Sequence, residues 1–543
     1  MEKLEPVSEF LWLKRRSSSF RLLLTVGLAT WSALLLVSLW NLFIFNSPHH
    51  DQTWFLYAAQ RMIAGAKLYG PGIAGPGIVE TNPPLIIWFS AIPVELARLL
   101  HLGPVLMLKL VVLAAVVGSM MWSYRILRAA GWKLSPGFLS LALCSILTAE
   151  LLLHGFDVGQ REHLLVILFI PYLLSSACIG KSDLSLAERC AIGVAGGVAV
   201  CFKPQQVLIL FGLEVFLVLW RRPLRRVLRA ELLCAASAIL LYIFLIYLVS
   251  PLYFTKMIPL LLDCYWAYGG FKASFLFRAA AHANIVLLLA LIVFVLCRRR
   301  LRYSALSGSF LACAVGASLA YYLQHTGWAY QIYPYHAFLV LAVLWIGFGL
   351  APAGLDNWRP RLSLAVGAFA LALAFLVPLL LRLHIRQVRA ETAQESYVQT
   401  ALAGLPPQTP VLVLSTSLDA FPTVLEEHLT WASRFAHLWM LPAIIQNERA
   451  QVGGPKPKKV LSPGTVQRLA ELQRTEVAED LLRWKPDVVV VSKCRKSAPC
   501  QALGDLDFDI VSWFGRSAAF AAQWSHYRIR SSSADYDVYQ RSS

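Results

Sequence analysis

Residues 85–100 read LIIWFSAIPVELARLL, and the orientation of the whole chain depends on whether this stretch crosses a membrane. It is shorter than the roughly 20 apolar residues that a spanning helix needs. It also carries Pro93, Glu95 and Arg98. If the stretch crossed, every later loop would change sides. If it lay along the surface as an amphipathic helix, the later loops would keep theirs.

The charges downstream decide between these two readings. Three short loops between apolar runs carry twelve basic residues: Arg125, Arg128, Lys133, Arg221, Arg222, Arg225, Arg226, Arg229, Arg298, Arg299, Arg300 and Arg302. Cytoplasmic loops are enriched in Lys and Arg. A crossing helix at 85–100 would put all twelve on the wrong side, so we predict an interfacial helix there.

The composition places the chain in a membrane. Of its 543 residues, 57% are hydrophobic and 15% charged, against about 25% charged in soluble domains. A water-soluble enzyme, a disordered chain and a fibrous protein are therefore excluded. The net charge of +18 is explained by the cytoplasmic loops better than by binding of nucleic acid.

The fold class expected is a polytopic α-helical membrane protein with eleven transmembrane helices. The first run follows the basic residues at 14–21 and ends near residue 45. It is too long for a signal-peptide core, so it is interpreted as a signal anchor with a cytoplasmic N-terminus. The other runs are 104–124, 134–153, 163–180, 187–202, 205–220, 231–250, 283–297, 304–323, 334–350 and 362–381. The outer segments are then 46–103, 154–162, 251–282 and 324–333.

Residues 382–543 are predicted to form a soluble α/β domain outside the membrane, after a transmembrane catalytic domain at 1–381. Its expected elements are strands at Val411–Ser415, Asp487–Ser492 and Asp509–Trp513 and a helix at 464–484. Cys494 and Cys500 lie in this domain with five residues between them. Because disulfides form outside the cytoplasm, we predict one between these two cysteines.

The first outer segment concentrates ionisable side chains at its two ends. It reads His49-His50-Asp51 where the first helix leaves the membrane, and Glu80-Thr81-Asn82-Pro83-Pro84-Leu85 before the interfacial helix. A carboxylate at the membrane surface is costly when it is desolvated and unpaired. Asp51 and Glu80 therefore suit acid–base or metal chemistry on a substrate presented there. Two prolines fit the first turn of the helix that follows.

This segment resembles the first outer loop of the GT-C superfamily of glycosyltransferases, in particular the branch of the protein O-mannosyltransferases and lipid A aminoarabinose transferases. Asp51 matches the acidic residue after the first span. Residues 80–85 match a Glu-x-Pro-Pro-Leu-like motif, with one extra residue before the prolines. That branch often has Lys before the prolines, where this chain has Asn82. The resemblance implies a GT-C-like architecture over roughly residues 20–335.

A second outer turn matches the superfamily more weakly. It reads HGFDVGQREH over residues 154–163, and the resemblance makes Asp157 the second acidic site residue. The expected catalytic set is therefore Asp51, Glu80 and Asp157, with Asp51 as the base and the other two in metal or acceptor binding. Some members of the superfamily use a metal near these acids and others do not. This chain therefore either binds a divalent ion through Asp51, Glu80, Asp157 and His50 or uses no metal.

Five further residues are predicted to bind substrate. Lys203 follows an apolar span at its outer end, where it suits the phosphate of a lipid-linked donor, although a lysine extending to the surface fits the same pattern. Arg161 offers a second positive charge. His325, Tyr330 and Gln331 lie in the outer turn QHTGWAYQIYP, where aromatic residues also serve as interface anchors.

These features predict a membrane glycosyltransferase, either a hexosyl- or a pentosyltransferase. Nucleotide sugars are cytoplasmic and the site faces outward, so the expected donor is a polyprenyl-phosphate-linked sugar. The expected acceptor is a glycan, a lipid or a protein. The resemblance implies direct displacement with inversion. Usage rich in Ala, Leu and Arg suggests a bacterium, in which the chain would lie in the plasma (inner) membrane with its C-terminal domain extracytoplasmic.

Two other classes of function were weighed. A transporter or flippase of lipid-linked sugars would carry ionisable residues near the midplane and often an inverted repeat. In this sequence the acidic residues gather at the outer surface, and no repeat is visible. A non-catalytic assembly protein would use the outer domain at 382–543 as its working part. The set Asp51, Glu80 and Asp157 argues against that reading.

Overall fold

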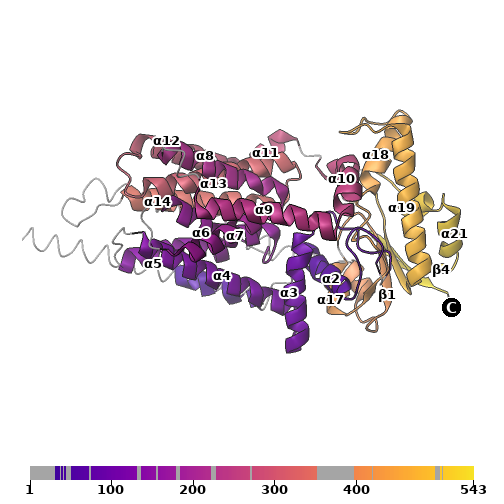
Figure 1. The fold of residues 1–543 in the computed structure, drawn as a ribbon. Coiled ribbons are helices and arrows are strands. Elements are labelled where there is room, and N and C mark those ends of the chain that lie inside the picture. Colours follow the sequence, from indigo (N-terminus) through magenta and orange to yellow (C-terminus); the bar gives the residue numbers. More distant parts are fainter. Residues whose placement is uncertain are drawn as a thin grey trace, which may run out of the picture.

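A bundle of apolar helices and an α/β domain lie at opposite ends of the molecule (Figure 1). The computed structural model describes residues 31–36, 38–40, 42–43, 50–72, 75–130, 136–154, 157–178, 184–221, 228–269, 272–350, 397–418, 420–495, 500, 502–503 and 506–542. The boundary predicted at residue 381 falls outside these ranges, as do most of the first span and all of the span at 362–381.

Nine of the predicted spans coincide with helices in the described part of the chain. These elements are α4 (Pro104–Ala129), α5 (Pro136–Leu147) with the π-helix η1 (Thr148–Leu152), α6 (Arg161–Ala177), α7 (Leu186–Cys201), η2 (Pro204–Gln206) with α8 (Val207–Arg221), α9 (Ala230–Val249), α12 (Ala281–Cys297), α13 (Ser304–Gln324) and η6 (Ala329–Ile332) with α14 (Tyr333–Leu350). By length and composition, four helices among the described residues can each cross a membrane, and a fifth span results if α11 (Ala273–Ala279) and α12 count as one bent helix. Eleven spans therefore stay a prediction.

Two ion pairs link neighbouring helices at the two ends of α7. Arg125, near the end of α4, pairs with Glu188 at the start of α7 at 2.5 Å. At the opposite end of α7, Lys203 contacts Glu162 at the start of α6. Arg125 and Lys203 therefore lie at opposite ends of α7.

Helix α3 (Leu85–Leu100) runs across the direction of the bundle helices (Figure 1). Ile86, Ile87 and Val94 are buried, whereas Leu99 and Leu100 are 65% and 59% exposed. The helix ends at His101, whose left-handed backbone conformation stops it. A helix with one buried face and one exposed apolar edge, lying across the bundle, is the arrangement expected of an interfacial helix.

Close packing between α7 and α9 depends on glycine. A Cβ atom on Gly193 would lie 2.5 Å from the Glu231 carbonyl oxygen, and one on Gly197 would lie 2.5 Å from that of Ala235. Two glycines four residues apart lie on one face of a helix, so the backbones can approach closely. The α7 start is fixed by a capping box in which the Ser185 hydroxyl accepts from the Glu188 backbone N–H.

The C-terminal domain is built on a five-stranded mixed sheet in the order β2-β1-β3-β5-β4. Strands β1, β2 and β3 are parallel, and β4 and β5 form an antiparallel hairpin on β3. The strands are β1 (Pro410–Leu414), β2 (Thr430–Trp431), β3 (Val488–Ser492), β4 (Tyr527–Ser532) and β5 (Tyr536–Arg541); the helices are α16 (Tyr397–Leu402), α17 (Phe421–Glu426), α18 (Leu441–Gln451), α19 (Pro463–Trp484), α20 (Ile510–Phe514) and α21 (Ala518–Trp524). The predicted α/β character and the helix at 464–484 agree with this fold.

One predicted strand is wrong. Residues Asp509–Trp513 form the start of helix α20, because the Asp509 carboxylate accepts hydrogen bonds from the Ser512 backbone N–H at 3.0 Å and the Ser512 hydroxyl at 2.6 Å. An aspartate in this position caps a helix and overrides the strand preference of Ile510 and Val511.

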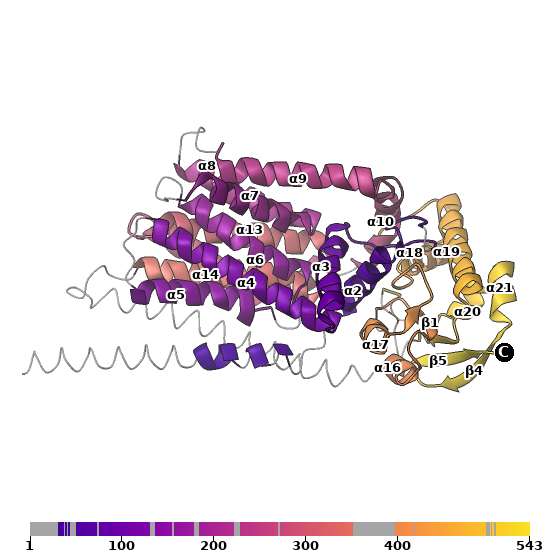
Figure 2. The same ribbon diagram turned by 60° about the horizontal axis from the view of Figure 1, so that its bottom comes forward.

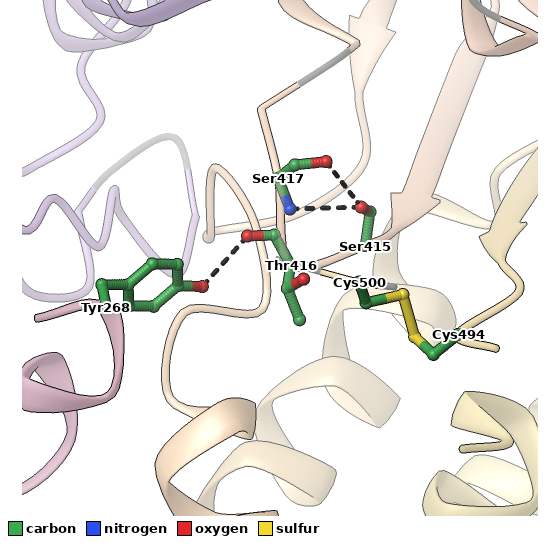
Figure 3. The surroundings of a disulfide bond; sticks show 6 residues. All are labelled: Tyr268, Ser415, Thr416, Ser417, Cys494 and Cys500. Carbon is green, nitrogen blue, oxygen red and sulfur yellow. Dashed lines mark hydrogen bonds between the residues drawn. A yellow bond between two sulfur atoms is a disulfide. The ribbon is translucent and has the colours of Figure 1, made fainter. Parts of the chain in front are cut away.

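Cys494 and Cys500 are joined by a disulfide, with 4.9 Å between their Cα atoms. It lies just after β3 and close to residues 415–417, which follow β1 (Figure 3).

Candidate functional site

The N-terminal ends of α2 and α6 bring a carboxylate and a guanidinium together. Asp51 lies in the first turn of α2 (His50–Ile63), and its Oδ2 accepts from Arg161 Nη2 at 3.3 Å and from Gln160 Nε2 at 3.1 Å. Arg161 is only 2% exposed and also donates to the Tyr330 hydroxyl at 3.3 Å. Its guanidinium carbon lies 5.4 Å from the centre of the Phe55 ring. The apolar surroundings strengthen the pairing of these two charges.

A second pair of opposite charges lies beside the first. Lys203 Nζ donates to Glu162 Oε1 at 2.7 Å and lies 5.2 Å from the centre of the Tyr330 ring. Burial lowers the pKa of Lys203 to about 8, against the opposing influence of the Glu162 carboxylate. Tyr330 therefore stands between two buried cations, Arg161 and Lys203.

Glu80 is buried next to this cluster. The carboxylate is 2% exposed; Oε2 accepts from the Trp54 indole N–H, and Oε1 accepts from the Asn82 backbone N–H at 2.8 Å and its amide at 2.6 Å. Burial raises the pKa of Glu80, while these hydrogen bonds and the charge of Arg161 oppose the rise. Tyr69 in turn donates to the Asn82 carbonyl at 2.6 Å. Asn82 thus fixes Glu80 from the position where related motifs often have Lys.

Asp157 lies on the turn between η1 and α6. Among the described residues its side chain makes no hydrogen bond or ion pair, and it is half-buried. Burial raises the pKa of Asp157 well above its usual range, and the charges of Glu162 and Asp51 raise it further. The backbone of this turn is fixed by the Gly159 N–H, which donates to His163 Nδ1 at 3.2 Å.

Among the described residues, the side chains predicted for a metal are not placed to share an ion. Both carboxylate oxygens of Glu80 already accept hydrogen bonds from Trp54 and Asn82. Across the described residues, no three His, Cys, Asp or Glu side chains are placed to share an ion. The His50 side chain lies outside the described residues. We therefore derive no step through a metal, and metal dependence stays an expectation.

Two of the predicted substrate contacts lie apart from the charged cluster. Gln331 accepts from the Thr326 hydroxyl at 2.6 Å and so stabilises its own turn. His325 ends α13 in a left-handed backbone conformation. Among the described residues, neither side chain contacts Arg161 or Lys203, whereas Tyr330 contacts both.

Sequence reasoning passed over three residues that the fold brings to this place. Trp54 holds Glu80, and Glu162 holds Lys203. Tyr265, in the 3₁₀-helix η5 (Tyr265–Tyr268), lies within electrostatic reach of Arg161, Asp51, Glu80 and Glu162. Its ring meets that of Trp328 edge-on at 6.4 Å. Glu162 stood beside a predicted residue in the sequence, but nothing in the local pattern marks Tyr265.

Comparison with solved structures finds similar folds at low sequence identity. ArnT from Cupriavidus metallidurans bound to undecaprenyl phosphate is 14% identical, with a TM-score of 0.45, over 95% of this chain and 97% of that one. The apo form of the same protein gives 15% identity and a TM-score of 0.43, over 96% and 98%. The arabinofuranosyltransferase AftD from Mycobacteria gives 14% and 0.36, over 95% of this chain and 42% of that one.

At TM-scores below 0.5, these matches identify neither a family nor a site residue. No family model and no curated protein matches the chain.

Proposed function

We propose that this chain is a membrane glycosyltransferase that moves a sugar from a polyprenyl-phosphate carrier to an acceptor on the outer face of the membrane. The observation that supports this most directly is the cluster at the outer helix ends. There Asp51 lies beside Arg161, and Lys203 lies one tyrosine ring away. A base and two buried cations at a membrane surface suit the transfer of a group from a lipid phosphate.

The proposed reaction is a single displacement at the anomeric carbon. The acceptor hydroxyl oxygen forms the new bond to that carbon while the bond from carbon to the phosphate oxygen breaks. The hydroxyl proton passes to Asp51, and the electron pair of the broken bond stays on the phosphate. Arg161 and Lys203 balance the negative charge that the polyprenyl phosphate gains. Attack opposite the leaving phosphate inverts the anomeric configuration.

Each buried cation of the site has a carboxylate partner when no substrate is bound. Arg161 is paired with Asp51, and Lys203 is paired with Glu162, so neither cation is left unpaired in the low-dielectric interior. A lipid phosphate would compete with Glu162 for Lys203. Aromatic rings at Tyr265 and Trp328 stand beside this cluster and offer a surface for a sugar ring.

Replacing Asp51 with Asn tests the proposal. The amide keeps the shape of the side chain but cannot take a proton, so turnover should fall by roughly 10²–10⁴-fold. Purified wild-type and Asp51→Asn proteins in lipid would be given a panel of polyprenyl-phosphate sugars with membrane extract as the source of acceptor. The measurement is the release of free polyprenyl phosphate. Full activity in a correctly folded Asp51→Asn protein would reject Asp51 as the base.

A further inference from the structure

The C-terminal domain packs directly on the side chain that holds Glu80. The Trp54 ring lies 4.7 Å from that of Phe421 on α17, and Phe421 lies 4.8 Å from Trp431 on β2. All three rings are at most 2% exposed. Since Trp54 donates its indole N–H to Glu80, the position of this donor depends on a ring of the C-terminal domain.

The same domain also holds the backbone that leads into Glu80. The Val79 backbone N–H donates to the Arg434 carbonyl at 2.8 Å, and Val79 forms a parallel bridge with Phe435. Arg61, at the end of α2, donates to the Ser433 carbonyl at 2.7 Å. Residues 433–435 are fixed in turn, because Asp480 accepts from the Arg434 side chain at 2.8 Å and from its backbone N–H at 2.9 Å. The first outer segment and the C-terminal domain thus share one hydrophobic core. Figure 2 shows the ribbon of α2 beside α17 of that domain.

An independent set of contacts reaches Tyr265 from another part of the domain. Tyr268, in the same 3₁₀-helix, donates to the Thr416 carbonyl at 3.0 Å in the segment after β1 (Figure 3). Lys459 donates to Asp263 Oδ1 and to the Leu262 carbonyl, both at 3.0 Å, at the end of α10 (Ile258–Cys264). The segment that carries Tyr265 is therefore tied to the C-terminal domain on both sides.

We propose that the C-terminal domain is part of the active centre: it holds Glu80 through Phe421 and Trp54, and it holds Tyr265 through Tyr268 and Thr416. Phe421 and Tyr268 are then positioning residues that act on the reaction from outside the membrane. The effect on turnover rests on the proposed function. The effect on the geometry of Glu80 does not, so the two parts can be tested separately.

The first test compares Phe421→Leu with Phe520→Leu in the full-length protein. Phe520, on α21 of the same domain, is equally buried and serves as the matched control. Its ring stacks on that of Phe514 of α20, with 5.3 Å between the ring centres. Phe421→Leu should lower kcat about ten- to a hundredfold with little change in KM for the donor, because misplacement of a site group has effects of that size. Phe520→Leu should leave kcat within about twofold, because a packing change away from the site alters the stability of the protein rather than the geometry of the site.

Hydrogen exchange gives a readout that does not need activity. The Asn82 amide N–H bonds to Glu80, so its exchange reports whether the Glu80 pocket is formed. Peptides covering residues 79–84 should exchange about tenfold faster in Phe421→Leu and at the wild-type rate in Phe520→Leu. Equal exchange in the two variants would overturn the proposal. If the wild type transferred no sugar at all, the proposed function would fail, while the exchange comparison would still decide this inference.

The second test removes one hydroxyl. Tyr268→Phe loses the hydrogen bond to Thr416, whereas Tyr527→Phe removes a buried hydroxyl that has no hydrogen-bond partner among the described residues. Peptides covering residues 263–268 should exchange several-fold faster in Tyr268→Phe alone. Unchanged exchange there, or the same increase in both variants, would remove Tyr265 from the proposal.

Discussion

At the scale of single residues, Lys203 ties the charge of the site to pH. Its pKa is lowered to about 8, so the ammonium is charged below that pH and neutral above it. Affinity for polyprenyl phosphate should therefore fall as pH rises through about 8. Lys203→Gln should bind about ten- to a hundredfold more weakly at pH 7, the loss of a charged hydrogen bond, and show no such pH dependence. Lys272→Gln, an exposed outer lysine, is the control, and a pH profile shared by all three proteins would contradict the assignment.

How far the sequence predicts the site is also decided residue by residue. Asp51 and Glu80 are predicted because a desolvated carboxylate at a membrane surface is costly and because both match the GT-C motif. Lys203 is predicted because a lysine at the end of an apolar span suits a lipid phosphate. None of these arguments needs the fold. Their partners could not be chosen in the same way. Glu162 meets Lys203 across 41 positions, and Trp54 meets Glu80 across 26, so these contacts exist only after the helix ends have come together.

At the scale of elements, α7 depends on its small residues. Gly197→Val places a side chain against the Ala235 backbone, which would lie 2.5 Å from the new Cβ and cannot move away freely. The variant should lose about 1–3 kcal/mol of stability, as overpacked sites do. Gly118→Val on α4 is the control, since no described residue beyond its own stretch of helix lies within 4 Å of its added Cβ. Thermal unfolding in detergent measures the stability of both variants. Equal melting temperatures for Gly197→Val and Gly118→Val would show that α7 and α9 can move apart without loss of stability.

Elements of the C-terminal domain were less predictable than the spans. The buried run at β3 was found because four consecutive valines fit a strand covered on both faces. The hairpin of β4 and β5 is not among the predicted elements. Residues 527–530 do alternate between apolar and polar side chains, but this run is only four residues long, and β4 is buried only at Tyr527. Apolar length is a strong signal for a membrane helix, whereas an exposed edge strand leaves almost none.

At the scale of the whole molecule, the basic loops lie at one end of the bundle and the C-terminal domain at the other. Arg125 pairs with Glu188 at the first end, whereas Arg61 and Lys256 contact the C-terminal domain at the second. By the positive-inside rule, we propose that the C-terminal domain lies outside. One helix more or fewer before α4 would reverse this result, which is why α3 lying across the bundle matters to the entire topology.

Labelling from one side of the membrane tests that orientation. Val452 at the end of α18 is 84% exposed, and Leu186 at the start of α7 is 67% exposed, at opposite ends of the molecule. A cysteine at either surface position should cost little stability. In intact cells, a membrane-impermeant maleimide should label Val452→Cys above the background of the parent protein. It should label Leu186→Cys only after the membrane is opened. The reverse pattern would place the C-terminal domain in the cytoplasm and reject the proposed topology. It would also reject a lipid-linked donor, because the sugar donors in the cytoplasm are nucleotide sugars.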